Sequence, residues 1–138
     1  MSIISDAFQR IGIGKVKVIA GGIYKLEDGA IKIPDGDLKG DRTKHDFRTV
    51  VVLSNQTICN SVACPVVTII PLSSKTDSKA ETDIVIRKTE ENSLAHDSRL
   101  MLGYVQPVLK SDLEEKFGTL SEAEWEEVMG QIVWNFDR

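Results

Sequence analysis

Arg48-Thr49-Val50-Val51-Val52-Leu53-Ser54-Asn55 is the stretch that decides the fold, because it sets one charged residue at the head of a continuous apolar run. A β-branched run of this kind is typical of a central strand that is covered on both faces. A second apolar run, Ala63 to Leu72, leads into Pro71-Leu72-Ser73-Ser74. If the two strands are neighbours, an arginine and a hydroxyl converge at one edge of the sheet, where together they can bind a phosphate.

The size and composition of the chain indicate one domain. Its 138 residues are 41% hydrophobic, enough to bury a core, so we expect residues 1–138 to form a single domain. No apolar run reaches the roughly 18 residues of a membrane span, and residues 2–10 lack the order of a secretory signal. We therefore expect a cytoplasmic protein without membrane contact. Cys59 and Cys64 are too few for a disulfide framework, and we expect both to be buried, reduced thiols.

The formal net charge of −4 is unevenly distributed. Residues 111–138 hold eight acidic and two basic side chains, so this segment contributes −6 and the remainder of the chain carries +2. The acidity is concentrated in one predicted helical region. It does not exclude a positive groove for nucleic acid elsewhere on the surface.

The apolar pattern predicts a mainly β chain. Strands are expected at residues 16–24 (broken at 20–22), 30–33, 49–53, 63–72, 84–86 and 98–105. Pro34-Asp35-Gly36-Asp37 is a strong turn signal that opens a polar loop as far as Asp46. A loop of that length in a small domain is more often functional or mobile than structural filler. Ser73 to Thr82 is almost entirely polar and predicts a long hairpin connection.

Helices are expected mainly at the C-terminal end. Ser111-Asp112-Leu113-Glu114 has the capping-box pattern of a short helix, ended by Gly118, and Ser121-Glu122-Ala123-Glu124 begins a long one. Its apolar stripe consists of Trp125, Val128, Met129, Ile132, Val133 and Phe136. We expect this stripe to pack on the sheet and the glutamate-rich face to be solvated. With a further short helix at residues 5–11, capped by Ser5, the pattern predicts a small antiparallel barrel or a strongly curved sheet.

The order of the motifs resembles the MazF/PemK family of toxin ribonucleases from bacterial toxin-antitoxin systems. The matching segments are Gly22-Ile23-Tyr24, His45 to Ser54, Pro71-Leu72-Ser73-Ser74, Val105-Gln106-Pro107 and Lys110 to Ser121. They are similar, in turn, to the family's opening strand, its Gly-x-Arg-Pro-Val-Val-Val-Leu-Ser and Pro-Ile-Thr-Ser segments, its Asp-Gln-Pro motif and its closing pattern. The resemblance covers about residues 21–136 and leaves residues 1–20 as an N-terminal extension.

This resemblance implies an SH3-like barrel of the MazF/PemK/CcdB type, usually a homodimer, that cuts single-stranded RNA without a metal or another cofactor. In such a reaction the 2′-hydroxyl of the substrate attacks the adjacent phosphate. The protein then supplies no nucleophile, but it must stabilise negative charge and move protons. A cognate antitoxin would control the activity by occupying the RNA groove.

The resemblance also implies roles for single residues. Arg48 would clamp the phosphate, and Ser73 would donate a hydrogen bond to it. The acid and base positions of the PemK branch are Gly103 and Val105 here, so the proton-transfer group is unassigned, and His45 is a candidate because its ordinary pKa is near neutrality. The RNA-binding residues that we expect are Gln106, Ser74, Lys44, Lys75 and Phe47.

Each assignment has a simpler alternative. Arg48 could pair with a carboxylate such as Asp46 or Asp112, Ser73 could be an ordinary turn hydroxyl, and both histidines could be exposed surface residues. Two other functions are open: a toxin of the same fold that poisons a protein such as gyrase, and a non-catalytic SH3-like module. Trp134-Asn135-Phe136 is reminiscent of the gyrase-directed relatives, although membership of the helical stripe favours a place for its phenylalanine in the core.

Overall fold

The computed structural model describes residues 16–40, 46–78 and 80–137. The helix expected at residues 5–11 and the candidate site residues Lys44 and His45 lie outside the described residues. No helix in the described ranges is long and apolar enough to cross a membrane.

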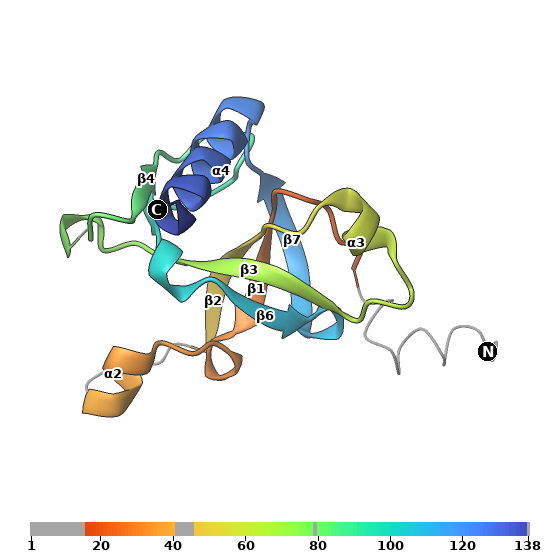
Figure 1. Ribbon diagram of the computed structural model, residues 1–138, viewed down its shortest axis with the longest axis horizontal. Helices are drawn as coiled ribbons and strands as arrows, with labels where there is room; N and C mark the ends of the chain where they lie inside the picture. The colour runs from red at the N-terminus through yellow and green to blue at the C-terminus, as the bar shows by residue number, and fades with distance from the viewer. Residues whose placement is uncertain (1–15, 41–45, 79, 138) are drawn as a thin grey trace.

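The described residues form one antiparallel sheet of seven strands with a C-terminal helix (Figure 1). The strands are β1 (Gly22–Glu27), β2 (Phe47–Val52), β3 (Val66–Ser73), β4 (Ile84–Ile86), β5 (Ser98–Leu100), β6 (Gln106–Leu109) and β7 (Leu113–Thr119). They pair in the order β4-β5-β3-β2-β1-β7, and β6 pairs with β3. These pairings leave the sheet open, so the expected barrel takes the form of a curved, unclosed sheet.

Two short helices, α2 (Pro34–Lys39) and α3 (Gln56–Asn60), connect strands, as do the single 3-10 turns η1 (Asp28–Ala30), η2 (Thr76–Ser78), η3 (Leu102–Tyr104) and η4 (Lys110–Asp112). The C-terminal helix α4 (Glu122–Phe136) follows the last strand. The two cysteines are free thiols. Cys59 is buried and Cys64 is half-buried.

The apolar run at the centre of β2 contributes to two cores. Val50, Val51 and Val52 are all fully buried. Val50 and Val52 belong to a cluster inside the curve of the sheet, whereas Val51 belongs to a second cluster that includes side chains of α4. This alternation confirms the expected central strand that is covered on both faces.

Several predicted elements are confirmed with shifted ends, and others are wrong. The strand at 84–86 matches its prediction, but residues 30–33 form no strand, and the expected strand 98–105 ends at Leu100. The turn predicted at Pro34 begins α2 instead, because proline suits the first turn of a helix, where its missing N–H is not needed. Residues 73–82 do not close a hairpin, since β5 lies between β3 and β4.

The first capping-box pattern is misleading. Residues 113–119 form β7, which pairs along β1, and not a helix. Leu113 is fully buried in the inner core. The ammonium group of the fully buried Lys110 donates hydrogen bonds of 2.7 and 2.9 Å to the carbonyls of Ile58 and Ser61. These tertiary contacts outweigh the local helix signal.

The second capping box is confirmed, but the stripe that follows is only partly buried. The backbone N–H of Glu124 donates to Ser121 Oγ at 3.1 Å, and the N–H of Ser121 donates to Glu124 Oε1 at 2.8 Å. Val128 is fully buried, whereas Val133 is 67% and Phe136 80% exposed. The last turn of α4 therefore extends past the core, and the expected core packing of Phe136 is wrong.

Candidate functional site

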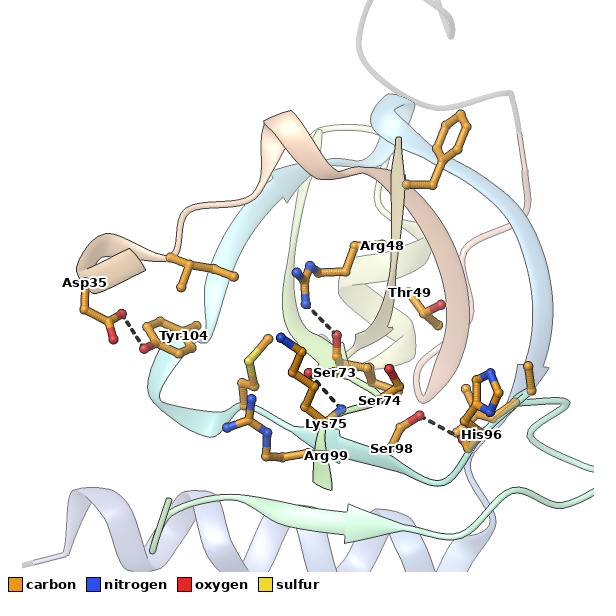
Figure 2. Close-up of a pocket in the computed structure, with 16 residues that line it drawn as sticks. Asp35, Arg48, Thr49, Ser73, Ser74, Lys75, His96, Ser98, Arg99 and Tyr104 are labelled. Carbon is orange, nitrogen blue, oxygen red and sulfur yellow. Dashed lines mark hydrogen bonds between the residues drawn. The ribbon is translucent and has the colours of Figure 1, made fainter. Parts of the chain in front are cut away.

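A cavity of about 510 Å³ opens beside the ends of β2, β3 and β5 (Figure 2). Its polar lining consists of Asp35, Arg48, Thr49, Ser73, Ser74, Lys75, His96, Ser98, Arg99 and Tyr104. Of the residues predicted from sequence, Arg48, Ser73, Ser74, Lys75 and Phe47 all line this cavity. The structure thus brings the strand-head arginine and the strand-end serines together.

A buried carboxylate holds Arg48 in place. Arg48 lies opposite Leu26 of β1, and Asp28 follows two residues later in η1. Arg48 Nε donates to Asp28 Oδ1 at 3.0 Å, and Nη1 donates to the carbonyl of Leu72 at 2.9 Å. The Arg48 side chain is 13% exposed, while that of Asp28 is fully buried. An ion pair was one expected alternative, but its partner is Asp28 and not Asp46 or Asp112.

These two bonds fix the arginine without using up its donors. A guanidinium has five N–H bonds in a planar fork. Two of those on Arg48 are directed at Asp28 and Leu72, so within the described part of the chain three remain for a ligand. A pre-oriented, permanently charged fork of this kind is suited to a phosphate.

The serine turn at the end of β3 supplies further donors. The backbone N–H of Lys75 donates to Ser73 Oγ at 3.2 Å. Ser73 is therefore a turn hydroxyl, which was the simpler alternative expected from the sequence. This bond uses an oxygen lone pair and leaves the hydroxyl hydrogen to donate to a ligand. The side chains of Ser74 and Lys75 are exposed and also line the cavity.

A second arginine, Arg99, was missed by sequence reasoning. It lies on β5 directly opposite Ser73, and its Nη1 is 3.1 Å from Oδ2 of the nearly buried Asp83. Its side chain is 15% exposed. The sequence did contain a signal for Arg99, the same one that identified Arg48. Each arginine is a single charge at the head of an apolar run, which for Arg99 is Leu100-Met101-Leu102.

The segment 87–97, between β4 and β5, forms one wall of the cavity and is held by the fully buried Asn92. Asn92 Oδ1 accepts from the backbone N–H groups of Thr89 and Leu94 at 2.9 and 3.1 Å, and Nδ2 donates to the carbonyl of Arg87 at 2.9 Å. The side chain therefore organises the segment from within.

The same segment packs on β7 and presents a histidine. The N–H of Thr119 donates to the carbonyl of Glu91 at 3.1 Å. A Cβ on the neighbouring Gly118 would lie 2.4 Å from that carbonyl oxygen, so only glycine fits. His96 is exposed, as expected, yet it lines the cavity, and its carbonyl accepts from Ser98 Oγ at 2.9 Å.

Tyr104 and Gln106 position the opposite wall. The Tyr104 hydroxyl donates to Asp35 Oδ1 at 2.5 Å, and mainly this bond, together with burial, raises the pKa of Tyr104 to about 12. Gln106 does not line the cavity. Its Oε1 accepts from the N–H of Lys32 at 2.8 Å, and its Nε2 donates to the carbonyls of Lys32 and Tyr104, both at 2.9 Å. This geometry favours a positioning role for Gln106.

Phe47 contributes an aromatic ring to the cavity lining. It is 41% exposed, and the Lys25 ammonium lies 4.0 Å from its ring centroid, which is a cation–π geometry.

In the described residues no group of three or more His, Cys, Asp or Glu side chains is arranged to hold a metal ion.

These features define a small, mainly β protein with a curved antiparallel sheet, a C-terminal helix and a cavity lined by two arginines. Residues 31–136 match the family model described as PemK-like, MazF-like toxin of type II toxin-antitoxin system. The chain belongs to this toxin family, as its motif order predicted.

Solved structures agree with this assignment at the level of the fold. MazF from Deinococcus radiodurans has a TM-score of 0.65 and 13% identity, covering 89% of this chain and 99% of that one. Mycobacterium tuberculosis toxin MazF-mt6 has a TM-score of 0.57 and 21% identity, covering 67% and 88%. A mycobacterial endoribonuclease in complex with its cognate antitoxin has a TM-score of 0.58 and 11% identity, covering 86% and 91%. No curated protein sequence matches the chain.

Proposed function

We propose that this toxin is an endoribonuclease that cleaves single-stranded RNA in the cavity, using the substrate's own 2′-hydroxyl and no metal ion. The observation that carries the proposal is the convergence of Arg48 and Ser73 on one cavity, with Lys75 and Arg99 beside them. Family membership supports it. So do two structurally similar mycobacterial proteins that are themselves endoribonucleases.

The proposed reaction needs charge stabilisation more than a nucleophile. The 2′-oxygen forms a bond to phosphorus, the bond from phosphorus to the 5′-oxygen breaks, and a 2′,3′-cyclic phosphate and a 5′-hydroxyl result. Negative charge grows on the non-bridging oxygens in the transition state. The three remaining N–H bonds of Arg48 and the Ser73 hydroxyl would donate to those oxygens.

Proton transfer is assigned to His96. The 2′-hydroxyl must lose a proton and the 5′-oxygen must gain one, and an imidazole, which can accept a proton on one nitrogen and donate one from the other, can serve either step. Tyr104 is too weak an acid, since its pKa is raised to about 12. Of the described residues that line the cavity, His96 has the suitable chemistry. His45 stays a prediction outside the described residues.

The partners follow from the same proposal. Two of the similar structures are toxin-antitoxin complexes, the mycobacterial one and MazE-MazF from Deinococcus radiodurans. We expect a cognate antitoxin to bind this chain in the cytoplasm and to block the cavity, and we expect the toxin to be a homodimer.

One observation favours a second candidate function. Trp134 is 59% and Phe136 80% exposed, so the aromatic end of α4 is available to contact a protein, as a gyrase-directed toxin would require. The third alternative, a non-catalytic SH3-like module, would place Arg48 and Ser73 far apart or buried. Their shared cavity does not favour it.

Mapping of cleavage ends tests the proposal. The purified protein is incubated with defined single-stranded RNAs of varied sequence in excess chelator. We expect cleavage that leaves a 2′,3′-cyclic phosphate and a 5′-hydroxyl. Absence of cleavage across the substrates would favour the protein-binding toxin, and loss of cleavage in chelator alone would overturn the metal-independent mechanism.

A further inference from the structure

The cavity contains two anchored arginines, although one scissile phosphate requires only one. Arg48 is paired with Asp28 and Arg99 with Asp83, at 3.0 and 3.1 Å. Both carboxylates are at least nine-tenths buried, and both arginine side chains keep a small exposed fraction. Each pair thus holds a guanidinium rigidly at the cavity wall, which lowers the entropic cost of binding an anion there.

The two arginines lie on different sides of Ser73. Arg48 bonds to the carbonyl of Leu72, the residue before Ser73. Arg99 is the cross-strand partner of Ser73, and such pairs project their side chains from the same face of a sheet. β3, which ends at Ser73, lies between β2 and β5 in the sheet, and in the view of Figure 2 the Lys75 side chain is drawn between those of Arg48 and Arg99. The cations therefore form a row along the cavity.

A single phosphodiester cannot use the whole row. It carries one negative charge and two non-bridging oxygens, which the fork of Arg48 and the hydroxyl of Ser73 are sufficient to bind. The backbone of a nucleic acid presents the next phosphate one nucleotide away, as a second anion of the same kind.

We propose that Arg99 binds the phosphate next to the scissile one, so that the cavity has a second phosphate subsite. This inference rests on the proposed RNA-cleaving function. Arg99 then contributes to substrate binding in the ground state and in the transition state equally. Its loss should raise KM and leave kcat nearly unchanged.

The test uses variants that do not leave a buried charge alone. The double variant Asp83→Asn/Arg99→Gln removes both charges of the pair, and Arg99→Lys keeps both. The matched control is Arg87→Gln, which neutralises an exposed arginine that does not line the cavity. Thermal melts establish that each variant is folded.

Two measurements are made on each variant: cleavage kinetics with a short RNA, and binding of the same RNA carrying 2′-O-methyl groups, which blocks cleavage, at several salt concentrations. We expect the double variant to raise KM about tenfold with kcat within about threefold. We also expect the slope of log Kd against log salt to fall by about 0.7, the value of one phosphate contact on a single strand. Arg99→Lys should keep the slope.

The outcomes separate this inference from the proposed function. If the native protein cleaves RNA and the double variant changes KM and slope no more than Arg87→Gln does, the second subsite is wrong and the function stands. If kcat falls about 100-fold at constant KM, Arg99 acts on the scissile phosphate and the second subsite is also wrong. If the native protein does not cleave, yet binds the methylated RNA with an Arg99-dependent slope, the cleavage proposal fails and the subsite stands.

Discussion

The replacement of Asp28 by alanine perturbs the site most directly, because Asp28 holds Arg48. The Asp28 side chain is fully buried, and that of Arg48 is 13% exposed. Removal of one partner of a buried ion pair costs about 3–5 kcal/mol. In this variant, Arg48 keeps its partial contact with solvent and its hydrogen bond to the carbonyl of Leu72. We therefore expect the free energy of unfolding to fall by about 3 kcal/mol, the lower end of that range. For a chain of 138 residues, this loss of stability lowers Tm by about 10 °C.

A double-mutant cycle measures the coupling of the two residues. Asp28→Ala, Arg48→Ala and the double variant are unfolded in urea, with Glu27→Ala as an exposed neighbouring control that should change stability by less than about 0.5 kcal/mol. Because each single variant leaves the other charge without its partner, the double variant should be no less stable than either. The coupling energy should therefore be at least as large as the greater single loss, about 3 kcal/mol.

RNA cleavage connects this cycle with function. If Asp28 orients the guanidinium, Asp28→Ala should also slow cleavage by about 10- to 100-fold at a temperature where the variant is folded. A coupling energy below about 0.5 kcal/mol, together with cleavage at the native rate by Asp28→Ala, would show that the buried pair does not position Arg48.

Three further predictions concern the walls of the cavity. Gly118→Ala should destabilise the fold by about 1–3 kcal/mol in urea unfolding, because its Cβ would clash with a backbone carbonyl at 2.4 Å. The control Gly130→Ala, inside α4 with open space around it, should stabilise by about 1 kcal/mol, and equal effects would contradict the clash. Because the pKa of Tyr104 is raised in the folded protein, its stabilising contribution should be complete below pH 10.0 and should be lost as the pH approaches 12. In an ultraviolet titration, the native protein should show a tyrosine ionisation step near pH 12 that is absent from Tyr104→Phe. The same step in both proteins would contradict that value. His96→Ala should slow cleavage about 100-fold, and added imidazole should restore part of the rate; a slow variant without rescue would remove His96 from proton transfer.

The strands that sequence predicted well are those with strong local patterns. The β-branched run at Val50-Val51-Val52 needed no tertiary information, since its composition alone indicates burial on both faces. The capping box at Ser121 was equally local, because its two hydrogen bonds join residues three positions apart. By contrast, the same pattern at Ser111 was overridden by the pairing of β7 with β1.

The candidate site was only half predictable, because its anchors depend on strand register. Arg48 was identified from its place at the head of an apolar strand and from the family resemblance. Its partner Asp28 is 20 residues away, and the pairing of Leu26 with Arg48 brings the two together. Arg99 likewise reaches the cavity only because β5 pairs with the end of β3. No local pattern encodes these pairings.

In the proposed reaction, Arg48 clamps the phosphate at which RNA is cleaved. Arg48→Lys tests it most directly, because lysine keeps a positive charge opposite Asp28, and with it the fold, but lacks the planar fork. The measurement is the single-turnover cleavage rate of the native protein and the variant on one RNA in excess chelator, with equal melting behaviour as the control. We expect a rate about 100-fold lower in the variant. Cleavage at the native rate by a folded Arg48→Lys protein would contradict it.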